Sequence, residues 1–232
     1  MAAKVILITG ASSGIGLATA ELLHAEGFTV YGTSRRANNA SKYKFQMIEL
    51  DVNQEDSVAQ AIEKVISTEG HIDVLINNAG FAIAPAGAEE SSMQQAQAIF
   101  ETNFFGALYS ASKHALEGYS ESLDHELRSH GIRVSLIEPA YTNTSLGMNL
   151  LKADAQVTAY EQIREKLHQQ MIETIRNSDD PSIVANTILA VINSQNILPR
   201  YTSGTTARYL KNLRKFAPVK VFDKLIQRSL KV

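Results

Sequence analysis

Residues 4–16 read KVILITGASSGIG, and this stretch decides the fold class. The apolar run Lys4–Thr9 predicts a short strand buried on both faces, as in a parallel sheet. A glycine-rich turn, Gly10–Gly16, leads into Leu17–Ala25, which has the apolar period of a helix. This order predicts a phosphate-binding cradle, because glycines let the backbone approach an anion and the helix N-terminus supplies N–H donors. A tight turn without a ligand is the alternative.

Strands and helices alternate along most of the chain. The apolar and turn patterns predict further strands at 28–33, 46–50, 72–76, 132–138 and 197–202. They predict further helices at 56–68, 155–176 and 182–192, the last opened by Asp180-Pro181. This alternation predicts an α/β fold, a doubly wound parallel sheet, in one domain that spans residues 1–232.

Composition excludes several kinds of site. The chain has 232 residues, is 44% hydrophobic and contains no cysteine, so disulfides, thiol nucleophiles and zinc–thiolate sites are ruled out. The six histidines show no metal-binding spacing, and a formal net charge of −2 argues against a general nucleic-acid binder. The N-terminal MAAKVILITG has too short an apolar run for a signal peptide or an anchor. We therefore expect a cytoplasmic protein.

The second predicted strand ends in Ser34-Arg35-Arg36. A dinucleotide-binding fold that prefers NAD has an acidic residue here for the ribose hydroxyls, whereas two guanidinium groups suit a 2′-phosphate. This position predicts NADP in preference to NAD as cofactor. An exposed charged loop without a ligand is the alternative.

Tyr109 and Lys113 lie four residues apart in the stretch NFFGALYSASK, residues 103–113. On a helix this spacing puts both side chains on one face. A neighbouring ammonium group favours the phenolate, so a tyrosine there becomes a usable acid or base near neutral pH. By itself this spacing is a weak signal.

Three motifs in this order resemble the short-chain dehydrogenase/reductase family, and the resemblance covers nearly the whole chain. They are the glycine-rich turn from Thr9 to Gly16, Asn77-Asn78-Ala79-Gly80, and Tyr109-x-x-x-Lys113. The wording of residues 109–144 resembles the branch that includes steroid and retinol dehydrogenases. The resemblance implies a Rossmann-like sheet and a lipophilic alcohol or ketone as substrate.

The resemblance also implies roles for individual residues. Tyr109 would be the general acid/base, Lys113 would hold the nicotinamide ribose and lower the tyrosine pKa, and Asn103 would order a proton-relay water. The remaining positions would bind the cofactor through its phosphates, adenine, ribose or carboxamide; they are Gly10, Ser12, Ser13, Gly14, Ile15, Gly16, Asp51, Val52, Asn78, Ala79, Gly80, Pro139 and Thr144. Ala140 stands where the family has a glycine.

The spacing between Asn103 and Tyr109 departs from the family. The family places several tens of residues there, with a strand and a catalytic serine, whereas these two residues are six positions apart. Either the protein lacks this segment and one family strand, or the sequence as printed omits residues that the protein carries. As printed, the apolar period predicts one continuous helix over residues 91–128.

The C-terminal extension, residues 199–232, is basic. From Arg200 onward nine lysines and arginines face one acid, Asp223, so this part carries +8 and the remainder −10. Phe216, Val219 and Phe222, with residues 226 and 230, recur at helical spacing. We expect an amphipathic helix that closes the substrate cleft; docking on an anionic membrane is the alternative. The family resemblance implies that residues 145–177 form a substrate lid.

Two functions of different class follow from these features. The first is an NADP(H)-dependent oxidoreductase, expected as a homodimer or homotetramer, that transfers a hydride to or from a lipophilic alcohol or ketone. The second is a nucleotide-binding protein without turnover, a sensor or partner subunit, because the serine-bearing segment is absent. A chain that does not fold as written is a third outcome.

Overall fold

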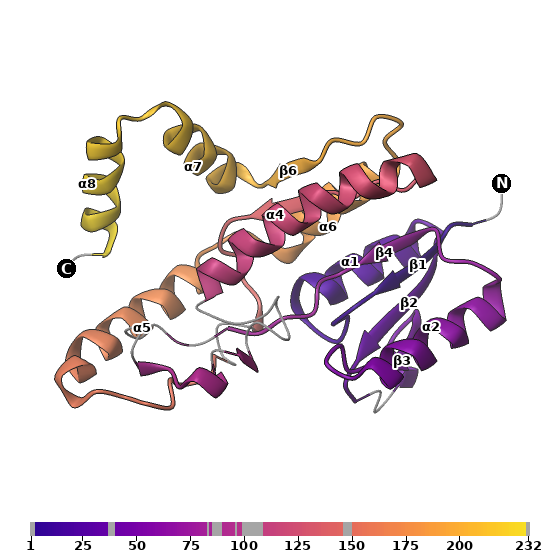
Figure 1. The fold of residues 1–232 in the computed structure, drawn as a ribbon, viewed down its shortest axis with the longest axis horizontal. Helices are drawn as coiled ribbons and strands as arrows, with labels where there is room; N and C mark the ends of the chain where they lie inside the picture. Colours follow the sequence, from indigo (N-terminus) through magenta and orange to yellow (C-terminus); the bar gives the residue numbers. More distant parts are fainter. Residues whose placement is uncertain are drawn as a thin grey trace.

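The computed structural model describes residues 3–36, 40–82, 84, 90–95, 97–98, 109–145 and 150–230, without the side chains of residues 40, 109–111 and 226–230. Asn103 and most of the predicted continuous helix over 91–128 therefore lie outside the described residues. The described part contains two parallel sheets with helices on both sides (Figure 1).

The larger sheet has four parallel strands in the order β3-β2-β1-β4. Its strands are β1 (Val5–Ile8), β2 (Thr29–Ser34), β3 (Gln46–Glu49) and β4 (Val74–Ile76). In the register, Leu7 of β1 lies opposite Tyr31 of β2 and Leu75 of β4. All carboxyl ends consequently reach the same edge, where open α/β sheets bind ligands.

The two faces of β1 bury different side chains. Ile6 and Ile8 join the core formed with helix α1 (Gly14–Ala25) and helix α6 (Pro181–Ile192), which pack against each other. Val5 and Leu7 join the core on the side of helix α2 (Glu55–Glu69). Burial on both faces is the reason that this strand is a continuous apolar run rather than an alternating one.

The smaller sheet pairs β5 (Leu136–Pro139) with β6 (Arg200–Ser203) in parallel. The crossover between them includes α6, whose first turn is capped because the Asp180 carboxylate accepts a hydrogen bond from the Ser182 N–H at 2.9 Å. Among the described strands, β4 pairs only with β1 and β5 only with β6. In the described residues, therefore, no strand pairing connects β4 of the larger sheet to β5 of the smaller one.

Charged side chains hold the long helix α4 (Tyr109–Leu127) to the smaller sheet. Asp124 is buried; it accepts hydrogen bonds from Arg133 Nε and the Val134 N–H, both at 2.9 Å, and it pairs with Arg128. Arg200, the first residue of β6, binds Glu117 and Glu121 of α4 at 2.8 and 2.7 Å and a β5 glutamate, residue 138, at 2.6 Å. The short 3-10 helix η3 (Arg128–His130) follows α4.

Helix α5 (Glu161–Arg176), preceded by the 3-10 helix η5 (Thr158–Tyr160), is fastened to residues 90–95. Glu90 is fully buried, pairs with Arg164 and accepts the Val157 N–H at 2.9 Å. Asp154 accepts hydrogen bonds from both the backbone N–H and the hydroxyl of Ser92. These contacts fix the segment around α5 to a distant part of the chain. A further 3-10 helix, η1 (Ala40–Lys42), precedes β3.

The expected amphipathic helix is present as α8 (Val219–Leu230), which begins three residues after Phe216, and the basic extension forms a further helix, α7 (Thr205–Phe216), that was not expected. The break follows from Pro218, because the residue before a proline avoids helical geometry, and Ala217 is extended with ψ of 136°. The expected strands, and the expected helices at 17–25, 56–68, 155–176 and 182–192, are confirmed with shifted ends; α5, for example, begins at Glu161 instead of 155, and β5 at Leu136 instead of 132.

Candidate nucleotide-binding site

The turn between β1 and α1 brings two glycines, Gly10 and Gly16, into close contact with neighbouring backbone. Gly10 has a left-handed φ of +69°, and a Cβ there would lie 2.9 Å from the Ala79 Cα. A Cβ on Gly16 would lie 2.4 Å from the Gly10 carbonyl oxygen. A side chain at either position would therefore fill the cradle, which is the reason that the sequence needs glycine at both.

The residues after β4 are locked onto this turn. Thr9 Oγ1 accepts hydrogen bonds from the backbone N–H groups of Asn78 and Ala79, at 2.9 and 3.0 Å. The Asn78 side-chain amide donates to the carbonyl oxygens of Thr9 and Gly10, at 2.9 and 3.1 Å. The structure thus joins two motifs that are about 70 residues apart in the chain into one rigid corner.

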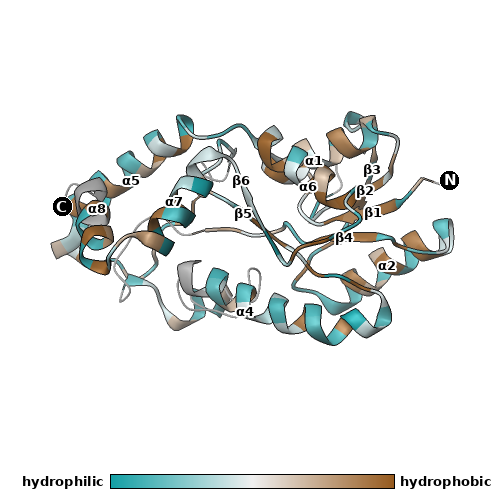
Figure 2. Cartoon of the chain, turned by 90° about the horizontal axis from the view of Figure 1, so that it is seen from above, coloured by the Kyte–Doolittle hydropathy of each residue, from teal (hydrophilic) through white to brown (hydrophobic). Residues whose placement is uncertain are grey.

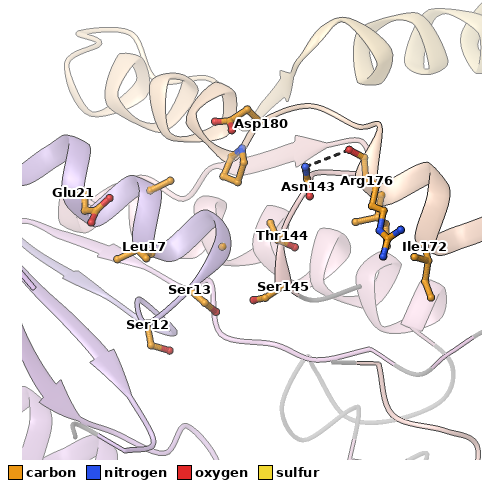
Figure 3. Close-up of a pocket in the computed structure, with 14 residues that line it drawn as sticks. Ser12, Ser13, Leu17, Glu21, Asn143, Thr144, Ser145, Ile172, Arg176 and Asp180 are labelled. Atoms are coloured by element: carbon orange, nitrogen blue, oxygen red, sulfur yellow. Dashed lines mark hydrogen bonds between the residues drawn. The ribbon is translucent and has the colours of Figure 1, made fainter. Parts of the chain in front are cut away.

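The N-terminus of α1 opens onto a pocket of about 470 Å³ (Figure 3). Ser13, the N-cap residue, has no side-chain capping bond in the structure, although serine commonly makes one. Ser12 and Ser13 line one side, and residues 143–145, which follow β5, line another. Thr144 contacts the turn directly, since a Cβ on Gly14 would lie 3.2 Å from it. Backbone N–H groups and the helix dipole make this end of α1 suited to a phosphate group.

Helix α5 completes the pocket and adds a residue that the sequence analysis did not single out. Ile172, Ile175 and Arg176 line its far side, with the apolar surfaces of Leu17 and Pro181 nearby. Figure 3 shows Arg176 across the pocket from Ser12 and Ser13, held in part because its carbonyl oxygen accepts the Asn143 side-chain amide at 3.3 Å. Only the fold brings this arginine opposite the N-terminus of α1, although its basic charge at a helix C-terminus was visible in the sequence.

The residues expected at the adenine end follow neighbouring strands of the larger sheet. Arg35 and Arg36 follow β2 and are exposed, and Asp51 and Val52 follow β3. Asp51 accepts the Asn53 N–H at 3.1 Å, which shapes the turn after β3. Because β2 and β3 are adjacent and parallel, these residues share the sheet edge that carries the glycine-rich turn.

The expected catalytic residues lie at the start of α4 or before it. Tyr109 is the first residue of this helix, and its side chain is outside the described part. Lys113 is half-buried, and this burial lowers the pKa of its ammonium group because desolvation disfavours the charged form. Pro139 ends β5, and Gly80 follows β4 by four residues. The roles of Tyr109, Lys113 and Asn103 stay predictions.

Neither a metal-binding cluster nor a membrane-spanning helix is found among the described residues. They contain no cluster of three or more histidine or acidic side chains arranged to hold a metal ion. Within the same part of the chain, no helix is long and apolar enough to cross a membrane.

The fold and the cradle define a nucleotide-binding α/β enzyme, and comparison with known proteins gives its family. A family model described as short chain dehydrogenase matches residues 4–108 and 105–156. A 3-ketodihydrosphingosine reductase from Bacteroides thetaiotaomicron is 39% identical over 188 residues, covering 64% of this chain and 68% of the relative. The uncharacterized oxidoreductase YusZ of Bacillus subtilis is 30% identical and covers 98% of both chains. The chain belongs to the short-chain dehydrogenase family of oxidoreductases.

Solved structures agree on the fold. A short-chain dehydrogenase from Streptomyces avermitilis is 27% identical, with a TM-score of 0.75 over 98% of this chain and 99% of that one. A Burkholderia phymatum short-chain dehydrogenase in complex with NAD has a TM-score of 0.75 at 21% identity, covering 92% and 94% of the two chains. A serine dehydrogenase complexed with NADP+ has a TM-score of 0.65 at 19% identity, covering 85% and 93%. The last two support the fold alone.

The family match falls in two pieces, and these overlap at residues 105–108. The aligned stretch with YusZ is 278 positions, which exceeds the 232 residues of this chain by 46. At least that many positions of YusZ therefore have no counterpart here. The interruption between β4 and β5 in the described sheet lies across the same part of the chain.

Proposed function

We propose that this protein binds NADP(H), in preference to NAD(H), and transfers a hydride between the nicotinamide and a lipophilic alcohol or ketone. The observation that carries the binding proposal is the cradle beside the N-terminus of α1, in which Gly10 packs against the Ala79 backbone and Gly16 against the Gly10 carbonyl and the Asn78 amide. A dinucleotide pyrophosphate fits this corner because it needs N–H donors without side chains in the way.

The chain's own residues divide the binding work by position. Ser12, Ser13 and Gly14 would hold the pyrophosphate from one side, with Arg176 across the pocket. Arg35 and Arg36, exposed after β2, would pair with the 2′-phosphate that distinguishes NADP from NAD. Thr144, which touches Gly14, would reach the carboxamide end.

The chemistry needs one group that moves a proton. The bound dinucleotide would supply or accept the hydride. Tyr109 would give the proton to the substrate oxygen during reduction and take it back during oxidation. Lys113, half-buried about one helical turn further along α4, would favour the phenolate and orient the ribose. Asn103 would hold the water through which Tyr109 regains its proton.

The substrate class rests on the resemblance of residues 109–144 to steroid and retinol dehydrogenases and on the name of one relative. The Bacteroides relative carries a name that specifies a ketone substrate, 3-ketodihydrosphingosine. We also propose a homodimer or homotetramer; Tyr119 on α4 is about half exposed and lies on a surface that a second copy could cover.

A second candidate, a nucleotide-binding protein without turnover, is favoured by the interrupted sheet. The described strands β4 and β5 belong to separate sheets, and the family match divides at 105–108. Losing a polar donor at the reacting oxygen costs about 10²–10³ in rate, so such a chain would retain the cradle while losing the reaction.

One set of measurements separates the two candidates. Titration with NADPH and NADH, followed by fluorescence, tests binding; oxidation of NADPH across a panel of aliphatic and steroidal ketones tests turnover. We expect NADPH to bind more tightly, with the preference lost in Arg35→Ala/Arg36→Ala, and turnover to fall about 10²–10⁴-fold in Tyr109→Phe with NADPH affinity retained. Tight NADPH binding without turnover on any ketone would select the second candidate, and absence of binding would reject both.

A further inference from the structure

Four consecutive residues, Phe216-Ala217-Pro218-Val219, form the turn between α7 and α8, and we name this turn the hairpin tip. Phe216 is 74% exposed and Val219 83% exposed, the largest exposed fractions among the big apolar side chains of α7 and α8 that the structure describes. The rest of the exposed apolar surface on these two helices comes from Tyr209, Leu210, Val221 and Leu225. Several large exposed apolar side chains concentrated on one helical hairpin favour an interaction surface.

The hairpin tip projects from the body of the protein (Figure 1). Helix α7 packs mainly against β6 and α8, and α8 packs mainly against α7. Ala207, near the start of α7, is buried, whereas the exposed apolar residues lie further along, toward the tip. Figure 2 shows apolar and polar faces on both helices. In the described part of the chain the tip therefore has no apolar surface packed against it.

Basic side chains lie on both helices that the tip joins. Among the side chains of α7 and α8 that the structure describes, six exposed cations stand against one acid, Asp223; they are Arg208, Lys211, Arg214, Lys215, Lys220 and Lys224. Lys215 Nζ lies 5.3 Å from the centre of the Phe216 ring, and the Arg214 guanidinium lies 5.3 Å from that of Phe222. Lys215 and Arg214 thus each lie over the face of an aromatic ring. Long basic side chains that flank apolar ones are suited to a boundary between hydrocarbon and water, because the stems bury while the charges stay hydrated.

We infer that the hairpin tip inserts into the surface of an anionic lipid bilayer, with Phe216 and Val219 below the headgroups and the surrounding lysines and arginines among the phosphates. Charge complementarity selects this occupant, since the segment from Arg200 onward carries +8 while the rest of the chain carries −10. A two-fold contact between two tips would instead bring like charges together. The mode is peripheral, consistent with a described chain that has no membrane-spanning helix.

This inference goes beyond the proposed oxidoreductase function and does not depend on it, because lipid binding is measured without cofactor or substrate. The experiment uses the full chain in co-sedimentation with phosphatidylcholine vesicles and with mixed phosphatidylserine/phosphatidylcholine vesicles, at low and high salt. We expect binding only to the anionic vesicles and weakening with salt. Each cation near the surface contributes about fivefold to the partition coefficient, so Lys215→Glu/Lys220→Glu should reduce binding by well over tenfold.

Two further variants separate insertion from simple charge attraction. Phe216→Ser/Val219→Ser keeps every charge and should also abolish most of the binding. Lys44→Glu/Lys64→Glu makes the same change in net charge near β3 and on α2, at exposed positions distant from the tip in Figure 1, and should bind as the parent does. All altered side chains are exposed, so thermal melts should match the parent.

Three results would overturn the inference. The first is no sedimentation with anionic vesicles at low salt. The second is an equal loss of binding in the tip charge variant and in Lys44→Glu/Lys64→Glu, which would mean attraction by overall charge alone. The third is a dimer in analytical ultracentrifugation that Phe216→Ser/Val219→Ser converts to a monomer, with vesicle binding unchanged, which would assign the tip to a second copy of the chain.

Discussion

Replacing Gly16 by alanine tests whether the cradle is packed as the structure has it. The added Cβ would lie 2.4 Å from the Gly10 carbonyl oxygen and 2.5 Å from Asn78 Nδ2. These separations are about 1 Å shorter than the ~3.5 Å at which non-bonded atoms attract one another. To relieve the overlap, α1 must move away from the turn or the Asn78 amide must give up its bonds to Thr9 and Gly10.

The expected magnitude follows from opposing terms. Overpacking costs about 1–3 kcal/mol, and each lost hydrogen bond adds about 0.5–1.5 kcal/mol. Alanine is favoured over glycine inside a helix by about 0.5–1 kcal/mol, which offsets part of this cost. A net destabilisation of about 1–3 kcal/mol remains, and in a domain of this size it should lower the Tm by about 2–10 °C. NADPH affinity should fall as well, because the same atoms form the cradle.

Gly118 in α4 is the matched control. It is also a helical glycine, but no atom lies within 4 Å of a Cβ built there. Gly118→Ala should therefore raise the Tm by about 1–4 °C through helix propensity alone. Circular dichroism melts and NADPH fluorescence titrations of both variants measure the contrast. If Gly16→Ala raised the Tm as Gly118→Ala does and bound NADPH normally, the close packing of α1 against the turn would be refuted.

Three further predictions rest on single side chains. The Arg133 guanidinium, with Arg128 and the Val134 N–H, holds the pKa of the Asp124 carboxyl well below its usual range, so its stabilisation is present above about pH 4 and is lost as the pH falls toward the depressed value. The Tm difference between parent and Asp124→Asn should shrink from pH 7 to pH 3, and a constant difference would contradict this. Leu23 is fully buried in the core that includes residues of α6. Changing it to alanine should lower the free energy of unfolding, measured with urea, by about 2–5 kcal/mol, and a decrease below about 1 kcal/mol would contradict its burial. Arg176→Ala should weaken NADPH binding about tenfold while leaving the Tm unchanged, and unchanged affinity would remove this arginine from the site.

The sequence by itself determined the local elements and their order. The double-sided apolar run at Val5–Ile8, the glycine-rich turn and the helix after it are local patterns, and alternation of such units leaves a parallel sheet as the fold. The start of α6 at Asp180-Pro181 could also be predicted from the sequence, because an N-cap depends on residues adjacent in the chain. Pro218 is also a local signal and accounts for the start of α8 at Val219 instead of Phe216, whereas α7 was not predicted.

Only the tertiary structure decided which distant residues meet. Sequence motifs named Gly10 and Asn78 separately, but the contact of the turn with Ala79, the position of Thr144 against Gly14 and the arrival of Arg176 opposite Ser13 depend on how the strands and α5 pack. A periodic pattern is a property of a few neighbouring residues, whereas a contact between residues far apart in the chain depends on the packing of every element between them. For the same reason the sequence could show a short interval between Asn103 and Tyr109, while the separation of β4 from β5 in the described sheet belongs to the fold.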